Sequence, residues 1–331
     1  MRQAVIAAPE RLEVVDAPRP ALRGPGEILL RTLASGICSG DLMPWYLARK
    51  VGTVFGHEPA GVAVEVGAEV RHVREGDLVF AHHHAPCLAC GECRRGAFVH
   101  CATWKGSRID PGGMAEFIRV PAEIVAADCF AVNELTAEQA LFIEPLACCA
   151  KAMARAQARG RVGVVGCGVM GLLNIQAALA LGCEAVAIEP DDARRAMASR
   201  WCEAMTPDEA REALKEKLDA VIVGPGFPEA IKQSLAYVRP AGVACLFTPT
   251  ATGVLTELDL GALYFRDVSL TPSYSCGPED TRTAYGWIRD GKVDPLPLVT
   301  HRFGLEDIQQ ALGTARRGGA CVKAVITFPE G

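Results

Sequence analysis

The chain has 331 residues, a length typical of about two domains. Half of the residues are hydrophobic and 22% are charged, so the chain can bury a sizeable core, and this composition excludes an intrinsically disordered chain. Its formal net charge of −5 has the wrong sign for a general nucleic-acid-binding surface. The sequence has no apolar run of about 18 residues and no signal-peptide pattern at its start, so we expect a cytoplasmic protein that does not span a membrane. Disulfides are rare in the cytosol, so clustered cysteines predict metal binding or catalysis.

The first part of the chain is predicted to be β-rich. Strand-like segments at 4–8, 12–16 and 27–33 are separated by turns that contain proline and glycine. Residues 61–80 alternate between apolar and polar side chains in the same way. We expect long loops between these strands to carry the functional residues.

Three residues in this part suggest a dispersed metal site. His57 and Glu58 are adjacent in the segment GHEPAGVAVEVG, and Cys38 stands in a loop earlier in the chain. Imidazole, thiolate and carboxylate are all ligands that zinc takes in proteins. Each residue also has an ordinary interpretation, as a packed cysteine or a surface polar residue, and the residues alone leave both interpretations open.

Three consecutive histidines come next, His82, His83 and His84. Consecutive side chains do not easily converge on one ion. We therefore predict a solvated or pocket-lining loop here rather than a metal site.

A tight cysteine cluster follows the histidines. Two, two and seven residues separate its members, and Gly91 and Gly96 allow tight turns between them. Four thiolates in so short a loop fit one tetrahedral Zn²⁺ with no open coordination position, which predicts a structural zinc site. A nucleic-acid-binding zinc ribbon is the alternative, and the acidic chain speaks against it. The members of the cluster are Cys87, Cys90, Cys93 and Cys101.

The pattern changes to alternating helices and strands near residue 134. Thr136 to Gln139 form a capping-box pattern that begins a helix. The alternation that follows predicts a parallel sheet covered on both faces, in a doubly wound α/β domain. The end of the chain contains a helix at about 279–290 and short strands that periodicity does not assign. The predicted strands of the parallel sheet are 162–166, 184–189, 219–224 and 243–247.

A glycine-rich fingerprint, G-x-G-x-x-G, follows the first of these strands and begins a helix. In that context it indicates a dinucleotide site, because the glycines let a pyrophosphate approach the helix N-terminus. A carboxylate at the end of the next strand hydrogen-bonds the ribose hydroxyls and repels a 2′-phosphate, so we predict NAD rather than NADP, although Arg194 and Arg195 lie nearby. The predicted cofactor-binding residues are Gly166, Gly168, Val169, Met170, Gly171 and Glu189.

The segment GHEPAGVAVEVG fits the pattern G-H-E-x2-G-x5-G. With Cys38 and the cysteine cluster, it resembles the zinc-containing alcohol dehydrogenases of the medium-chain dehydrogenase/reductase family over nearly the whole chain. The resemblance implies an α/β fold in which a β-rich, GroES-like catalytic domain (1–146 and 273–331) holds two zinc sites. A Rossmann NAD-binding domain (147–272) is inserted into it. The resemblance also implies a homodimer or homotetramer.

The resemblance further implies which residues hold the catalytic zinc. Cys38 and His57 stand where the family places zinc ligands, and Glu144 stands in the Glu-Pro-Leu context of the sorbitol (polyol) dehydrogenase branch. Glu58 is the alternative carboxylate, and the sequence does not show which glutamate binds the metal. We therefore expect two Zn²⁺ per chain, one catalytic and one structural, together with NAD.

The implied reaction interconverts a secondary alcohol, such as a polyol, sugar alcohol or cyclitol, and its ketone. Zinc would act as a Lewis acid on the alcohol oxygen and NAD would accept the hydride. The family's usual proton relay is missing, because Gly40 and Met43 stand where a hydroxyl and a histidine are typical. Glu58 or Glu144 could move the proton instead.

Other functions fit parts of the sequence. A threonine-type amino-acid dehydrogenase is the alternative within the same family. A non-catalytic NAD-binding or redox-sensing protein would explain the missing relay residues. A zinc-ribbon adaptor would bind a partner without NAD, and the context of the glycine-rich fingerprint argues against it.

Overall fold

The computed structural model describes residues 1–329, which form two compact units. Unit 1 comprises Met1–Pro145, Cys276–Arg289 and the segment that begins at Pro295. Unit 2 comprises Leu146–Ser275 and Asp290–Asp294. Helix α6 (Ile143–Arg155) begins in unit 1 and continues into unit 2.

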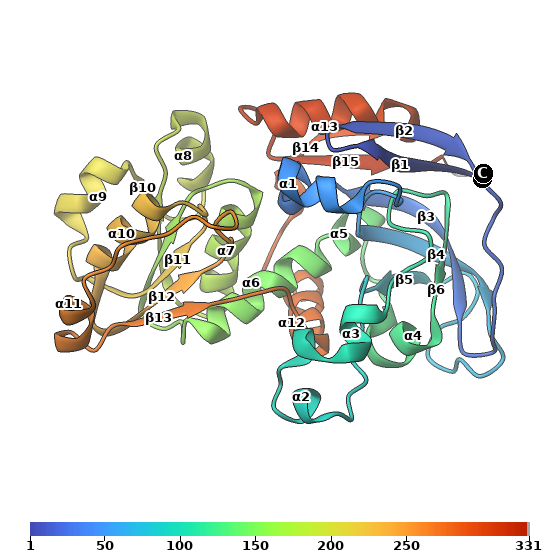
Figure 1. Ribbon diagram of the computed structural model, residues 1–331, viewed down its shortest axis with the longest axis horizontal. Coiled ribbons are helices and arrows are strands. Elements are labelled where there is room, and N and C mark those ends of the chain that lie inside the picture. Colours follow the sequence, from blue (N-terminus) through green and yellow to red (C-terminus); the bar gives the residue numbers. More distant parts are fainter. Residues whose placement is uncertain (330–331) are drawn as a thin grey trace. The chain divides into compact units, whose positions relative to one another are not determined.

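Unit 1 is built on a largely antiparallel sheet with β3 at its centre (Figure 1). β3 pairs with β4 along its whole length on one edge, and on its other edge it pairs with β6 over residues 28–31 and with β15 over residues 34–36. A separate hairpin is formed by β1 and β2. The strands are β1 (Arg2–Ala8), β2 (Arg11–Asp16), β3 (Ile28–Gly36), β4 (Glu58–Val66), β5 (Leu78–Ala81), β6 (Phe117–Val120), β7 (Cys129–Ala131), β14 (Val299–Gly304) and β15 (Lys323–Thr327).

Helices and apolar clusters complete unit 1. One cluster packs Ile28, Val79 and Ile118 of the central sheet, and another packs Leu312 of α13 against Ile326 of β15. The sequence analysis did not predict α13. The helices are α1 (Pro44–Leu47), α2 (Gly91–Arg94), α3 (Ala102–Gly106), α4 (Ala122–Asp128), α5 (Ala137–Ala140), α12 (Pro278–Arg289) and α13 (Ile308–Arg317).

Unit 2 is a parallel sheet with the strand order β10-β9-β8-β11-β12-β13. The order reverses between β8 and β11, and ligands bind at such a point in doubly wound folds. Helices cover both faces of the sheet, with α7 on one side and α10 on the other (Figure 1). The strands are β8 (Arg161–Val165), β9 (Glu184–Ile188), β10 (Glu203–Met205), β11 (Leu218–Val223), β12 (Val238–Leu246) and β13 (Ser269–Pro272). The helices are α7 (Val169–Ala180), α8 (Asp192–Ala198), α9 (Pro207–Ala213), α10 (Pro228–Tyr237) and α11 (Leu260–Phe265).

The predicted fold class is confirmed: a β-rich unit is joined to a doubly wound parallel sheet. The capping box at Thr136 is present and begins α5, which ends at Ala140. In residues 1–329 the structure contains no helix whose length and apolar character would let it cross a membrane.

Candidate functional site

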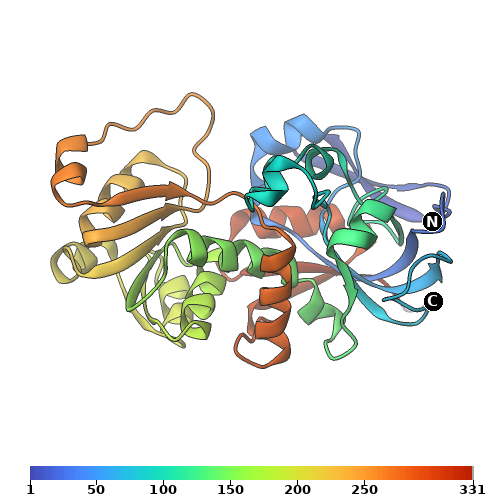
Figure 2. The same ribbon diagram turned by 90° about the horizontal axis from the view of Figure 1, so that it is seen from below.

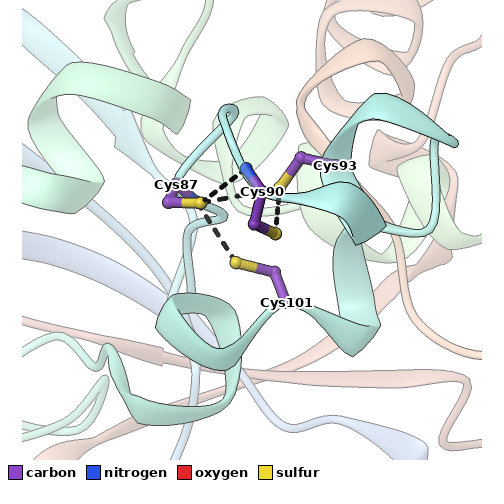
Figure 3. Close-up of side chains that lie close together, drawn as sticks. All are labelled: Cys87, Cys90, Cys93 and Cys101. Atoms are coloured by element: carbon purple, nitrogen blue, oxygen red, sulfur yellow. Dashed lines mark hydrogen bonds between the residues drawn. The ribbon is translucent and has the colours of Figure 1, made fainter.

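The cysteine cluster forms one compact group in the loop around α2 (Figure 3). The Sγ atoms of Cys90 and Cys93 are 3.5 Å apart, and those of Cys87 and Cys93 are 3.9 Å apart. A zinc tetrahedron with Zn–S bonds of about 2.3 Å has edges of about 3.8 Å. The four thiols therefore fit a zinc ion, as the spacing predicts.

Backbone amides favour the thiolate at Cys87 and Cys101, whereas burial and the neighbouring thiols raise the pKa of Cys93 to about 12. The amide of Cys87 donates to Sγ of Cys101 over 3.4 Å, and the amide of Cys90 donates to Sγ of Cys87 over 3.3 Å. Burial raises the pKa of Cys101, but the amides of Cys87 and Trp104 outweigh it and lower that pKa to about 6. Thiolates are the form that binds metal.

Cys38, His57 and Glu58 form a second group, in which the ligand atoms lie within 4.8 Å of one another. Cys38 precedes a 3-10 turn (Ser39–Leu42), where its Sγ accepts from the amide of Gly40. His57 and Glu58 stand at the start of β4. The bend before His57 depends on Gly56, whose φ of +81° favours glycine and whose added Cβ would lie 2.7 Å from the Met114 side chain.

The imidazole of His57 is oriented by a buried carboxylate. Nδ1 of His57 lies 3.2 Å from Oδ2 of Asp41, a close ionic contact without good hydrogen-bond alignment. Nζ of Lys50 lies 3.6 Å from Oδ1 of the same carboxylate. Burial lowers the pKa of His57, but Asp41 and Cys38 outweigh it and raise that pKa well above its usual range. Burial likewise opposes ionisation of Asp41, yet His57 and Lys50 lower its pKa.

Glu58 is held by a buried lysine from the end of the chain. Nζ of Lys323, on β15, donates to Oε2 of Glu58, and both side chains are almost fully inaccessible to solvent. The other oxygen, Oε1, is buried and makes no hydrogen bond to any group in residues 1–329. Because a buried carboxylate oxygen is normally satisfied, this one fits a role as a metal ligand. Lys323 is not among the site residues predicted from the sequence, and it is 265 residues from its partner.

Glu144 does not join Cys38, His57 and Glu58. In the described chain its carboxylate groups with His82 and Cys276, whose ligand atoms lie within 4.8 Å of it. Of the two alternatives predicted for the three histidines, a solvated or a pocket-lining loop, the solvated one is wrong at His82, which is fully buried. His82 faces inward because its backbone and its ring both bond Asp128 at the end of α4.

The glycine-rich fingerprint lies at the turn between β8 and α7. Gly166 has a φ of +86°, while a Cβ on Gly168 would meet no atom of the described chain within 4 Å. Gly168 is the N-cap residue of α7, and within residues 1–329 no side-chain hydrogen bond caps the amides of the first turn. Free amides and open space at a helix N-terminus fit a pyrophosphate.

Glu189 lies beside this turn. Its Oε2 accepts from the amide of Cys167 over 2.6 Å, and its Oε1 accepts from the amide of Asp191 over 2.9 Å. The carboxylate is thus placed at the carboxyl end of β9, next to the glycine-rich turn. This is the position that ribose recognition requires.

Comparison with known proteins gives matches over nearly the whole chain. Residues 24–129 match the alcohol dehydrogenase GroES-like domain, and residues 169–290 match the zinc-binding dehydrogenase family. The chain is 30% identical to the L-threonine 3-dehydrogenase of Pyrococcus horikoshii over 92% of this chain and 91% of that protein. It is 27% identical to the sorbitol dehydrogenase of Arabidopsis thaliana over 92% of this chain and 89% of that protein.

Solved structures share the fold. A zinc-binding dehydrogenase from Sinorhizobium meliloti, bound to NADP, superposes with a TM-score of 0.88 and 22% identity, covering 99% of both chains. The sequence resemblance is thereby confirmed at the level of the family. The chain belongs to the zinc-binding alcohol dehydrogenases of the medium-chain dehydrogenase/reductase family, which are oxidoreductases.

Proposed function

We propose that this chain is a zinc- and NAD-dependent dehydrogenase that interconverts a secondary alcohol of the polyol type and its ketone. The observation that carries the proposal is the convergence of Cys38, His57 and Glu58, whose ligand atoms lie within 4.8 Å of one another. One thiolate, one imidazole and one carboxylate leave a fourth position of a tetrahedral zinc open, as a catalytic site requires.

Each proposed ligand has a partner that fixes it. Asp41 faces Nδ1 of His57 and so leaves Nε2 for the metal, and Lys323 neutralises the buried charge of Glu58. When bound, zinc polarises the alcohol oxygen and NAD accepts the hydride. Gly40 and Met43 supply neither a hydroxyl nor an imidazole, so the proton does not leave by the relay typical of the family.

The remaining site assignments are proposed on the same basis. Cys87, Cys90, Cys93 and Cys101 would hold the structural zinc. The turn at Gly166, Gly168 and Gly171 would receive the pyrophosphate, and Glu189 would contact the ribose and favour NAD over NADP. Glu144, which the sequence resemblance implied as a further ligand of the catalytic zinc, is left out of the proposed centre, because its carboxylate lies with His82 and Cys276.

Threonine oxidation is the second candidate. It is favoured by the similarity to L-threonine 3-dehydrogenases, several of which match over more than 90% of this chain. The polyol proposal is supported by the Glu-Pro-Leu context of Glu144 and by the similarity to a sorbitol dehydrogenase. Both substrates carry a secondary alcohol, so the same zinc centre would serve either.

A substrate panel tests the proposal. Zinc-loaded protein is mixed with NAD⁺ or NADP⁺ and with polyols, cyclitols or L-threonine, and reduction of the cofactor is followed by absorbance. We expect reduction of NAD⁺ with a polyol or cyclitol, abolished by Cys38→Ala and retained by Cys321→Ala, whose buried cysteine lies in the apolar cluster around α13. Turnover of L-threonine alone would establish the second candidate, and absence of turnover with every alcohol would refute both.

A further inference from the structure

A second set of metal-ligating side chains is buried in unit 1, apart from Cys38, His57 and Glu58. His82 follows β5, Glu144 lies in the first turn of α6, and Cys276 precedes α12. Their ligand atoms lie within 4.8 Å of one another, and Nε2 of His82 is 3.6 Å from Sγ of Cys276. All three side chains are buried.

The imidazole of His82 is oriented as a metal ligand would be. Its Nδ1 lies 2.9 Å from Oδ2 of Asp128, and Oδ1 of Asp128 accepts from the hydroxyl of Thr281 over 2.6 Å. With the carboxylate as acceptor, Nδ1–H donates to Asp128, and Nε2 faces Cys276 and Glu144. Histidine ligands of metals usually donate their other nitrogen to a carboxylate in this way.

We propose that His82, Glu144 and Cys276 bind a Zn²⁺ ion of their own, in addition to the ions of the cysteine cluster and of the Cys38 centre. The donor set is one thiolate, one imidazole and one carboxylate, which suits zinc and excludes the oxygen-only sites that Mg²⁺ and Ca²⁺ prefer. The proposal goes beyond the dehydrogenase function, because no residue of the new site is shared with Cys38, His57 and Glu58.

A hydrogen-bonded network without metal is the alternative to a zinc ion. Asp128 and Thr281 satisfy one side of the His82 ring and link α4 to α12. On the other side, Sγ of Cys276 lies 3.6 Å from Nε2 of His82 and donates to the backbone carbonyl of Glu144 over 4.0 Å. A zinc ion would hold the same thiol and imidazole together with the Glu144 carboxylate, and zinc content distinguishes the two arrangements.

The new site is close to the Cys38 centre, so the test must separate the two. The ring of His83 lies 4.8 Å from the ring of His57 and 4.8 Å from that of His82, measured between centroids. Zinc content per chain is therefore measured on zinc-saturated, desalted protein by elemental analysis. The proteins compared are the natural chain, Cys276→Ala, Cys38→Ala and the control Cys321→Ala.

We expect three zinc ions in the natural chain and in Cys321→Ala, and two in Cys276→Ala and in Cys38→Ala. Two ions in both the natural chain and Cys276→Ala would overturn the proposal. It would also be overturned if the natural chain held two ions and Cys276→Ala and Cys38→Ala each held one, because a single centre would then use both cysteines. An unchanged content in Cys38→Ala alone would instead contradict the proposed catalytic centre.

A second variant guards against misfolding of Cys276→Ala. Asp128→Asn keeps all three ligands and weakens only the hydrogen bond that Nδ1 of His82 makes with the carboxylate of Asp128. We expect it to bind three ions at saturation but to give up one of them to a chelator about 10–100 times more readily than the natural chain. Loss to the chelator at an unchanged rate would contradict the role assigned to His82.

Discussion

At the scale of single residues, Asp41 illustrates how a buried carboxylate acts through its neighbour. It lies 3.2 Å from Nδ1 of His57 and is almost fully buried. Asp41→Asn removes the charge that holds the imidazole, so we expect zinc affinity at the Cys38 centre to fall by about 10–100-fold. Competition with a chromogenic chelator measures this change.

The matched control for Asp41→Asn is Glu27→Gln. Glu27 is also a buried carboxylate of unit 1, but it pairs with Arg119 and belongs to none of the three candidate metal groups. Glu27→Gln should change the stability of the protein without changing its zinc affinity. Equal losses of zinc affinity in the two variants would show that the effect of Asp41 is only structural.

Lys323 and Glu58 form the other pair that matters at this scale. Removing one partner of a buried ion pair leaves an uncompensated charge, which costs about 3–5 kcal/mol of unfolding free energy. We expect Lys323→Met to destabilise metal-free protein by about this amount in urea denaturation. Zinc should recover part of the loss, because the ion would face the unpaired carboxylate.

The double variant Lys323→Met/Glu58→Gln separates charge from packing. It removes both charges, so we expect it to be more stable than Lys323→Met alone when metal is absent. It should not gain stability from zinc at the Cys38 centre, since the ligand has gone. If the double variant is the less stable of the two, the charge of Glu58 is not what Lys323 compensates.

At the scale of elements, two glycines near the turn between β8 and α7 have different roles: Gly168 leaves room for a ligand, and Gly171 allows the helix to pack closely on the strand. A Cβ at Gly168 would enter open space, whereas a Cβ at Gly171 would collide with the carbonyl oxygen of Gly166. We therefore expect Gly168→Ala to keep the thermal midpoint of the protein but to weaken NAD binding. Gly171→Ala should instead lower the midpoint, because the helix must move away from the strand.

Two measurements on the same pair of variants check this distinction. Calorimetric titration with NAD⁺ gives the affinity, and thermal denaturation gives the midpoint. A Gly168→Ala protein that binds NAD⁺ like the natural chain would place the pyrophosphate elsewhere. The prediction for Gly171 would be contradicted by an unchanged midpoint.

Local patterns in the sequence predicted the elements whose signals are short-range. The alternation of apolar strands with helices predicts a doubly wound parallel sheet, though not its strand order, and cysteine spacing predicts the compact cluster at Cys87. Ile308, Ala311 and Leu312, which are buried on one side of α13, have helical spacing in the sequence, and this spacing is the signal that indicates α13.

Contacts between distant segments were not predictable in this way. Lys323 and Glu58 are 265 residues apart, and Cys276 and His82 are 194 residues apart. Lys323 and Cys276 have unremarkable local contexts, so only the packing of the sheet and of α12 brings them to their partners. The grouping of Glu144 with His82 follows from the same packing, and no spacing rule indicates it.

At the scale of the whole molecule, the outer edge of unit 2 bears on assembly. β13 is the last strand of its sheet, and in residues 1–329 its outer edge pairs with no other strand. Close to it along the chain lies α11, whose preceding loop stands clear of the sheet (Figure 2). Leu260, Tyr264 and Phe265 of α11 are 70%, 79% and 86% exposed. Unpaired strand edges and exposed apolar patches are both features that natural proteins cover.

We therefore predict that β13 and α11 form the interface of a homodimer, in which the same surface of each copy meets its counterpart. Phe265→Asp introduces a charge into this surface and should shift the mass in light scattering from twice 35.2 kDa to 35.2 kDa. Leu181→Asp alters an exposed apolar residue elsewhere in unit 2 and should leave the dimer intact. A natural chain that runs as a monomer, or a Phe265→Asp protein that stays dimeric, would mean that another surface covers this patch or that it is left exposed.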